Sequence, residues 1–157
     1  MKWTWLIFVA LAALSWGSYV PTIHHGQMGF GATNPNRSMR AFLFIGLAYF
    51  AMGVLVPGLW LLTHKEPADN GFTSTGVSMS TLAGILGAVG ALGVVFALKF
   101  GGSPLYVAPL VFAGAPIVSC FVYMIWDGWK TSIHPMFFVG LILAALGAAL
   151  VLRFKPA

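Results

Sequence analysis

The stretch VSMSTLAGILGAVGALGVVFALKF, residues 77–100, decides the fold, because its only charge, Lys99, lies beside its end. A helix rises 1.5 Å per residue, so about 20 apolar residues cross the hydrocarbon core of a bilayer. The chain holds five stretches of this kind, at residues 3–22, 41–63, 77–100, 104–126 and 135–154. A backbone in lipid must satisfy its own hydrogen bonds. The pattern therefore predicts an all-α integral membrane protein with five transmembrane helices.

The composition agrees with a membrane location. Of 157 residues, 59% are hydrophobic and 7% are charged, whereas a soluble domain carries about 25% charged residues. Five spans with short loops predict one membrane domain over residues 1–157. The single cysteine excludes an internal disulfide. The basic residues are scattered along the span ends, which predicts contact with membrane lipid and no binding of nucleic acid.

The first span admits a second interpretation. Lys2 and the apolar run that follows it also fit a signal peptide. Trp16 interrupts the small residues that a cleavage site needs, and the apolar character continues to Pro21. We therefore expect a retained first helix.

The charge distribution predicts orientation. Five spans place the two chain ends on opposite sides of the membrane. The side of the N-terminus holds three basic residues, which are Lys2, Lys65 and Lys130. The other side holds five, which are Arg37, Arg40, Lys99, Arg153 and Lys155. By the positive-inside rule the C-terminus is expected in the cytoplasm. A five-to-three division of basic residues also fits a chain that inserts into the membrane in both orientations.

Loops and turns separate the spans, and small residues lie within them. The longest loop is expected at residues 23–40, and the Gly101–Gly102 turn predicts an antiparallel hairpin of the third and fourth spans. The small residues within spans three and five are predicted to pack helices closely, and they are Gly84, Gly87, Gly90, Gly93, Gly140, Ala144 and Gly147. A dinucleotide-binding interpretation of the first four fails, because no strand precedes them.

Three prolines lie within spans. Each of Pro57, Pro109 and Pro116 removes a backbone donor, which predicts a break or bend in its helix. Two of them share span four, and broken helices often line transporter cavities. A static kink that only shapes the bundle is an equal alternative.

Several segments resemble the drug/metabolite transporters. Residues 14–21, LSWGSYVP, resemble the Trp-Gly-Ser signature that ends the first helix of that superfamily. The glycine-rich run from Gly84 to Gly101, the proline-bearing segment that follows it, and the stretch from Pro135 to Pro156 resemble the third, fourth and fifth helices of an EamA-like domain. The resemblance covers most of the chain.

This resemblance implies a transporter and a partner. Such proteins usually carry two five-helix repeats in inverted orientation, with the substrate cavity between them, and this chain has one repeat. The resemblance therefore implies a homodimer or pairing with another membrane chain, and a small-molecule substrate. The expected location is a bacterial inner (cytoplasmic) membrane.

The residues themselves narrow the substrate. No span contains a carboxylate near its middle, so a proton-driven mechanism is not expected. A neutral or weakly polar small metabolite fits better. The aromatic and hydroxyl residues that are candidates to line its cavity are Trp16, Ser18, Tyr19, Tyr49, Ser119 and Tyr123. By helical spacing Ser119 and Tyr123 share a face, as do Trp16 and Tyr19. Helix packing is an equal alternative for Trp16 and Tyr49.

Other chemistries are not expected. The adjacent His24 and His25 lack cysteine or carboxylate neighbours, so no metal site is predicted, and no cofactor is implied. No nucleophile motif is present, so an enzyme is not expected. Two classes of function remain, a single-repeat transporter and a non-transporting accessory subunit of a larger membrane complex.

Overall fold

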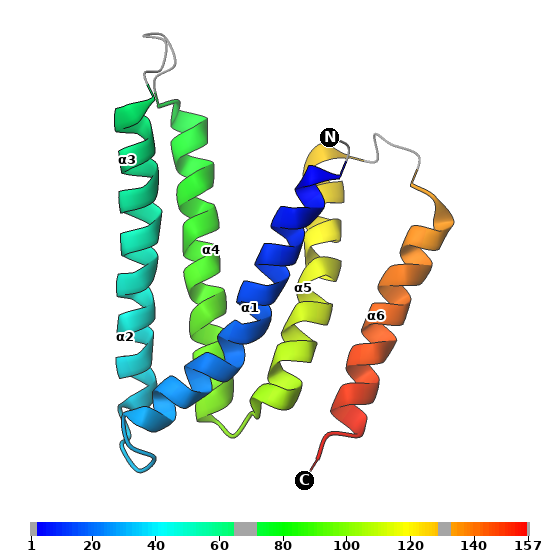
Figure 1. The fold of residues 1–157 in the computed structure, drawn as a ribbon. Helices are drawn as coiled ribbons and strands as arrows, with labels where there is room; N and C mark the ends of the chain where they lie inside the picture. The colour runs from blue at the N-terminus through cyan, green and yellow to red at the C-terminus, as the bar shows by residue number, and fades with distance from the viewer. Residues whose placement is uncertain (1–2, 65–71, 129–132, 157) are drawn as a thin grey trace. The chain divides into compact units, whose positions relative to one another are not determined.

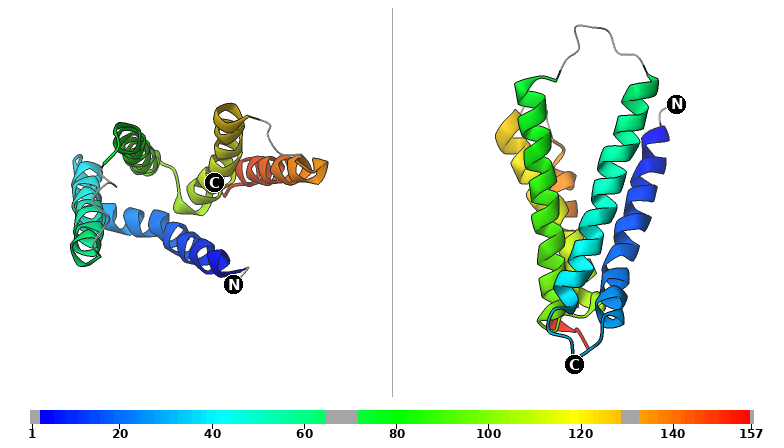
Figure 2. Two further views of the ribbon diagram at one scale, coloured as in Figure 1. Left: turned by 90° about the horizontal axis from the view of Figure 1, so that it is seen from above. Right: turned by 90° about the vertical axis from the view of Figure 1, so that its left-hand side faces the viewer.

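The computed structural model describes residues 3–64, 72–128 and 133–156, and among these it contains helices and no strand (Figure 1). In chain order the helices are α1 Thr4–Gly29, α2 Arg37–Phe50, the π-helix η1 Ala51–Leu55, α3 Val56–Thr63, α4 Ser74–Lys99, α5 Pro104–Asp127 and α6 Pro135–Arg153. Helices α2, η1 and α3 follow one another without a gap and form a single rod (Figures 1 and 2).

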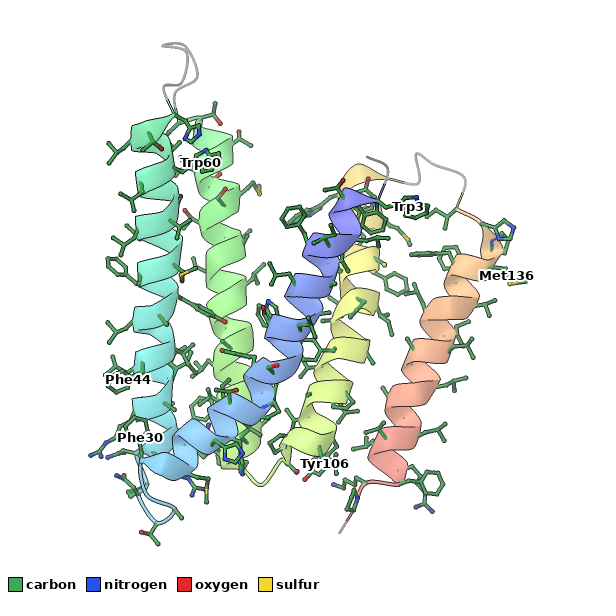
Figure 3. The ribbon with its side chains drawn as sticks, viewed as in Figure 1. Trp3, Phe30, Phe44, Trp60, Tyr106 and Met136 are labelled. Carbon is green, nitrogen blue, oxygen red and sulfur yellow. The ribbon has the colours of Figure 1, made fainter. Side chains whose placement is uncertain are left out.

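Five of the helical segments are long and apolar enough to cross a membrane, which confirms the prediction of a helical chain with five candidate spans. They contain 19 to 27 residues, and they are Thr4–Gly29, Arg37–Thr63, Ser74–Lys99, Pro104–Trp126 and Pro135–Arg153. Between 0 and 22% of each most apolar window is buried within the chain. Figure 3 shows apolar side chains projecting outward along the helices. These exposed faces are suited to lipid and not to water.

The first loop is shorter than expected. Helix α1 continues to Gly29 and α2 begins at Arg37, so much of the segment placed in a loop at residues 23–40 is helical. Ile23 and Gln27, one turn apart, are 4% and 1% exposed. The burial of this face stabilises a helix that the local glycines disfavour.

The chain divides into two compact units. Unit 1 comprises Met1–Pro21 and Gly101–Ala157, and unit 2 comprises Thr22–Phe100. Unit 1 thus holds most of α1 with α5 and α6. Unit 2 holds the end of α1 with the α2–η1–α3 rod and α4.

The core of unit 2 lies where three helix ends meet. Its fully or nearly buried residues are Ile23, Gln27, Ser38, Ala41, Ala91, Val94, Val95 and Leu98. The Gln27 side chain donates a hydrogen bond from Nε2 to the Val95 carbonyl oxygen at 3.1 Å, which ties α1 to α4. Helix α4 contacts α2, and the right-hand view of Figure 2 shows the two diverging toward α3.

The three span prolines have different effects. Pro57 lies in the first turn of α3, directly after η1. Because Pro57 has no N–H, the Gly53 carbonyl loses its usual partner, and the wider π-helical turn adjusts the helix there. Pro109 and Pro116 lie inside α5, which the structure gives as one continuous helix. These two prolines remove hydrogen bonds from α5 without ending it.

In unit 1, α5 and α6 are packed as neighbours (Figure 1). The turn before α5 contains Gly101 with φ of +93°, a conformation that favours glycine. Tyr106 donates a hydrogen bond from its hydroxyl to the Gly101 carbonyl at 3.0 Å. The Lys155 ammonium lies 5.1 Å from the Tyr106 ring centroid, so the end of α6 is held against the start of α5.

The buried bond of unit 2 generates a stability prediction. Gln27→Ala removes both the hydrogen bond to Val95 and the packing of the side chain, and should lower the free energy of unfolding by about 2–3 kcal/mol. The matched control is Leu43→Ala, because Leu43 is 61% exposed on α2 and should lose less than about 1 kcal/mol. Reversible denaturation in detergent followed by circular dichroism measures both. Equal losses in the two variants contradict the assignment of the core.

Candidate functional site

A pocket lies between α5 and α6 in unit 1. Its volume is about 350 Å³, and it is lined by Ser119, Cys120, Tyr123, Met124, Gly128, Ile133 and Phe137. The helix ends shape it. Gly128 ends α5 with a φ of 71°, and Pro135 begins α6. His134 caps α6 by accepting a hydrogen bond at Nδ1 from the Met136 N–H at 3.2 Å.

The lining of this pocket is mainly apolar with a few polar groups. Met124 is 6% exposed and supplies a buried wall, whereas Tyr123 is 64% exposed at the open side. The Ser119 and Tyr123 hydroxyls can each donate and accept a hydrogen bond, and Cys120 adds a free thiol. Among the described residues that line the pocket there is no acidic residue, lysine, arginine or histidine. Such a surface suits an uncharged molecule with one or two polar groups.

The structure therefore brings two of the predicted cavity residues together. Ser119 and Tyr123 lie one turn apart on α5 and line the same pocket. Sequence reasoning missed Met124, Phe137 and the role of Cys120. Spacing could have found Cys120 and Met124, which are four residues apart on α5. Phe137 lies on another helix, and no local signal aligns the two helices.

A second predicted group forms an aromatic cluster elsewhere in unit 1. The Trp16 and Tyr19 rings are 5.5 Å apart between centroids, as their i,i+3 spacing suggests. Trp16 also meets Phe112 of α5 edge-on at 6.3 Å. Ser18 lies beside them on α1 and is exposed. None of these four residues lines the α5–α6 pocket.

The last predicted cavity residue belongs to the other unit. Tyr49 lies on α2 and is 44% exposed. Unit 2 has its own groove of about 390 Å³ at the start of α4, lined by Phe72, Thr73, Gly76, Val77, Ser80 and Thr81. Thr73 is engaged as the helix cap, because its Oγ1 accepts a hydrogen bond from the Gly76 N–H at 3.1 Å. Sequence reasoning did not single out this groove, and Tyr49 does not line it.

The predicted packing glycines are open within the chain. A methyl group built onto any of them meets no atom within 4 Å, which holds for Gly84, Gly87, Gly90, Gly93, Gly140 and Gly147. That these faces pack against other helices stays a prediction. They remain smooth surfaces on α4 and α6.

The histidines take part in local contacts. The His24 and His25 rings are 6.2 Å apart on α1. His64 stacks on Trp60 at 4.0 Å between ring centroids, and its Nδ1 lies 3.0 Å from the Trp60 carbonyl. In the parts of the chain that the structure describes, no three His, Cys, Asp or Glu residues are grouped as a metal site would need.

Comparison of the chain with protein-family models, with characterised proteins and with solved structures finds no match. The resemblance to drug/metabolite transporters therefore rests on the motifs of the sequence alone.

The pocket generates a labelling prediction for the single cysteine. Ser119→Phe places a ring in the pocket beside Cys120 and should slow alkylation of the thiol by N-ethylmaleimide at least several-fold. Val118→Phe is the matched control, because Val118 is 62% exposed and does not line the pocket. Mass spectrometry of the intact protein follows the reaction. A rate that is unchanged by Ser119→Phe, or reduced equally by Val118→Phe, contradicts access through the pocket.

Proposed function

We propose that this chain is a small membrane transporter of the drug/metabolite type, which moves a neutral or weakly polar small metabolite as a dimer of five-helix repeats. The α5–α6 pocket carries the proposal. It sets two hydroxyls and a thiol among apolar walls on a membrane-spanning helix. Ligand sites commonly combine an apolar lining with a few polar groups that orient the ligand.

The pocket also supports the class of substrate. A charged solute at membrane depth needs a countercharge, because the hydrocarbon around it does not solvate ions. The described lining residues carry no such charge, so an uncharged solute fits best. The volume of about 350 Å³ lies at the small end of the range for ligand sites, which favours a small metabolite.

The open glycine faces support a dimer. In lipid, helices associate through small residues that let their backbones approach closely. A methyl group built on these glycines of α4 and α6 meets no described atom within 4 Å outside its own helix backbone, so a second copy is a suitable occupant. A dimer would supply the second repeat that the transporter superfamily usually carries in one chain.

The same faces support a second candidate, an accessory subunit of a larger membrane complex. In that case the glycine surfaces bind a different chain, and the pocket has no solute. Purification in mild detergent separates the two candidates. A homodimer supports the transporter, and a fixed set of other chains supports the subunit.

For the transporter, Tyr123→Phe and Ser119→Ala should each lower flux about fivefold, since each removes a hydrogen bond to the solute worth about 1 kcal/mol. Liposomes containing the purified protein are loaded with a defined mixture of sugars, nucleosides, amides and alcohols. Mass spectrometry of the exchanged solutes measures flux.

Tyr106→Phe is the matched control for this flux measurement. It removes the same atom from the other end of α5, where the hydroxyl binds the Gly101 carbonyl. Flux should stay within about twofold of wild type. If no solute exchanges, or if the three variants are equally impaired with intact assembly, the pocket does not bind the transported solute.

The dimer generates a separate prediction. Gly87→Leu adds a bulky side chain to the open face of α4 and should reduce the dimer fraction by about tenfold or more, while the monomer keeps its helical content, because nothing in the chain obstructs the added atoms. Leu86→Ile, on an adjacent exposed position, is the control. Native mass in detergent gives the dimer fraction. A variant that dimerises like wild type places the interface elsewhere.

A further inference from the structure

We propose that the end of unit 2 where α2 begins and α4 ends binds the headgroups of anionic phospholipids. The cationic rim of this end consists of Arg37, Arg40 and Lys99. His24 and His25 are on the part of α1 that belongs to the same unit.

The core of unit 2 holds the rim together. The Gln27–Val95 hydrogen bond fixes the end of α1 to α4. Ala41 and Leu98, each next in sequence to a rim cation, are 6% and 4% exposed. The start of α2 and the end of α4 therefore lie at one end of the unit, as Figure 1 shows.

No carboxylate of this unit lies in the sequence near the rim. The acidic residues of unit 2, Glu66 and Asp69, lie outside the described residues. The part of the unit that the structure describes contains no carboxylate, so none of its residues compensates the positive charge of the rim.

The rim lies at the ends of two candidate membrane spans, because α2 begins at Arg37 and α4 ends at Lys99. The Lys99 ammonium lies 5.6 Å from the Phe96 ring centroid and 5.8 Å from that of Phe100. Phe30 stacks on Phe44 at 5.8 Å near the start of α2 (Figure 3). Arg37 donates a hydrogen bond from its guanidinium to the Ala32 carbonyl, which holds it in the turn. Basic residues at span ends are typical of the membrane interface.

The occupant follows from this charge and depth. A phospholipid such as phosphatidylglycerol carries a net negative phosphate at the level of the rim, whereas phosphatidylcholine is neutral overall. Each Lys or Arg near an anionic membrane surface strengthens the attraction about fivefold. Two exposed cations of the rim are therefore expected to contribute a preference of more than about tenfold.

Native mass spectrometry of the full chain tests this proposal. The protein is released from nanodiscs of equal phosphatidylglycerol and phosphatidylcholine, and the lipids retained on it are counted. The wild type should retain phosphatidylglycerol in excess. Arg40→Gln with Lys99→Gln should lower that excess about tenfold or more, because both side chains are exposed parts of the rim.

The matched control, Lys2→Gln with Lys65→Gln, removes the same charge from positions outside the rim and should keep the excess. Raising the salt from about 0.05 M to about 0.5 M should also reduce the wild-type excess, which tests the proposal without a variant. An equal fall in the two double variants overturns the proposal, as does an excess that neither the rim variant nor salt changes. Displacement of phosphatidylglycerol by inorganic phosphate overturns it too, because the site then binds free anions.

Discussion

The lack of hydrogen-bonding partners in hydrocarbon is the constraint on which the rest of this structure depends. Every backbone N–H and C=O within the bilayer must be satisfied inside the chain, and helices do this residue by residue. A helix in hydrocarbon therefore does not depend on packing against other helices for its own stability. The spans Arg37–Thr63 and Pro135–Arg153 show this freedom, since none of the most apolar window of either is buried within the chain. These faces are suited to contact with lipid or with another membrane chain.

The same constraint explains which parts of the fold could be predicted. Long apolar runs identified all five spans, because length and hydropathy alone determine what crosses a bilayer. The end of α1 could not be predicted in this way. There the glycines disfavour a helix, and the burial of Ile23 and Gln27 by the rest of unit 2 overrides them. Likewise, the loss of a backbone hydrogen bond at Pro57 could be predicted from the sequence. The π-helical turn that accommodates Pro57 could not be predicted, because it depends on the whole α2–η1–α3 rod.

The candidate site also has one part that the sequence predicts and another part that it does not predict. Ser119 and Tyr123 were placed on one face by helical spacing alone, and they line one pocket. The opposing wall at Phe137 depends on the register of α6 against α5, which local spacing does not contain. For the glycine faces, the sequence predicts a packing surface but does not identify its partner. Their spacing predicts close packing, and a methyl group built on Gly87 or Gly140 meets no described atom within 4 Å outside its own helix backbone. A sequence can mark a surface for contact without identifying the chain that makes it.

The placement of charge also bears on how transport would be driven. All three acidic residues fall outside the five spans, and the histidines lie toward helix ends or in connecting segments. A carrier that couples to protons needs a group at membrane depth that changes its charge during the cycle. The proposed pocket has hydroxyls and a thiol in that position, and these bind a solute without taking up a proton. The energy for net movement would then come from the gradient of the solute or from exchange for a second solute. A charged substrate or a proton-driven cycle would require a partner chain to supply the missing ionisable group.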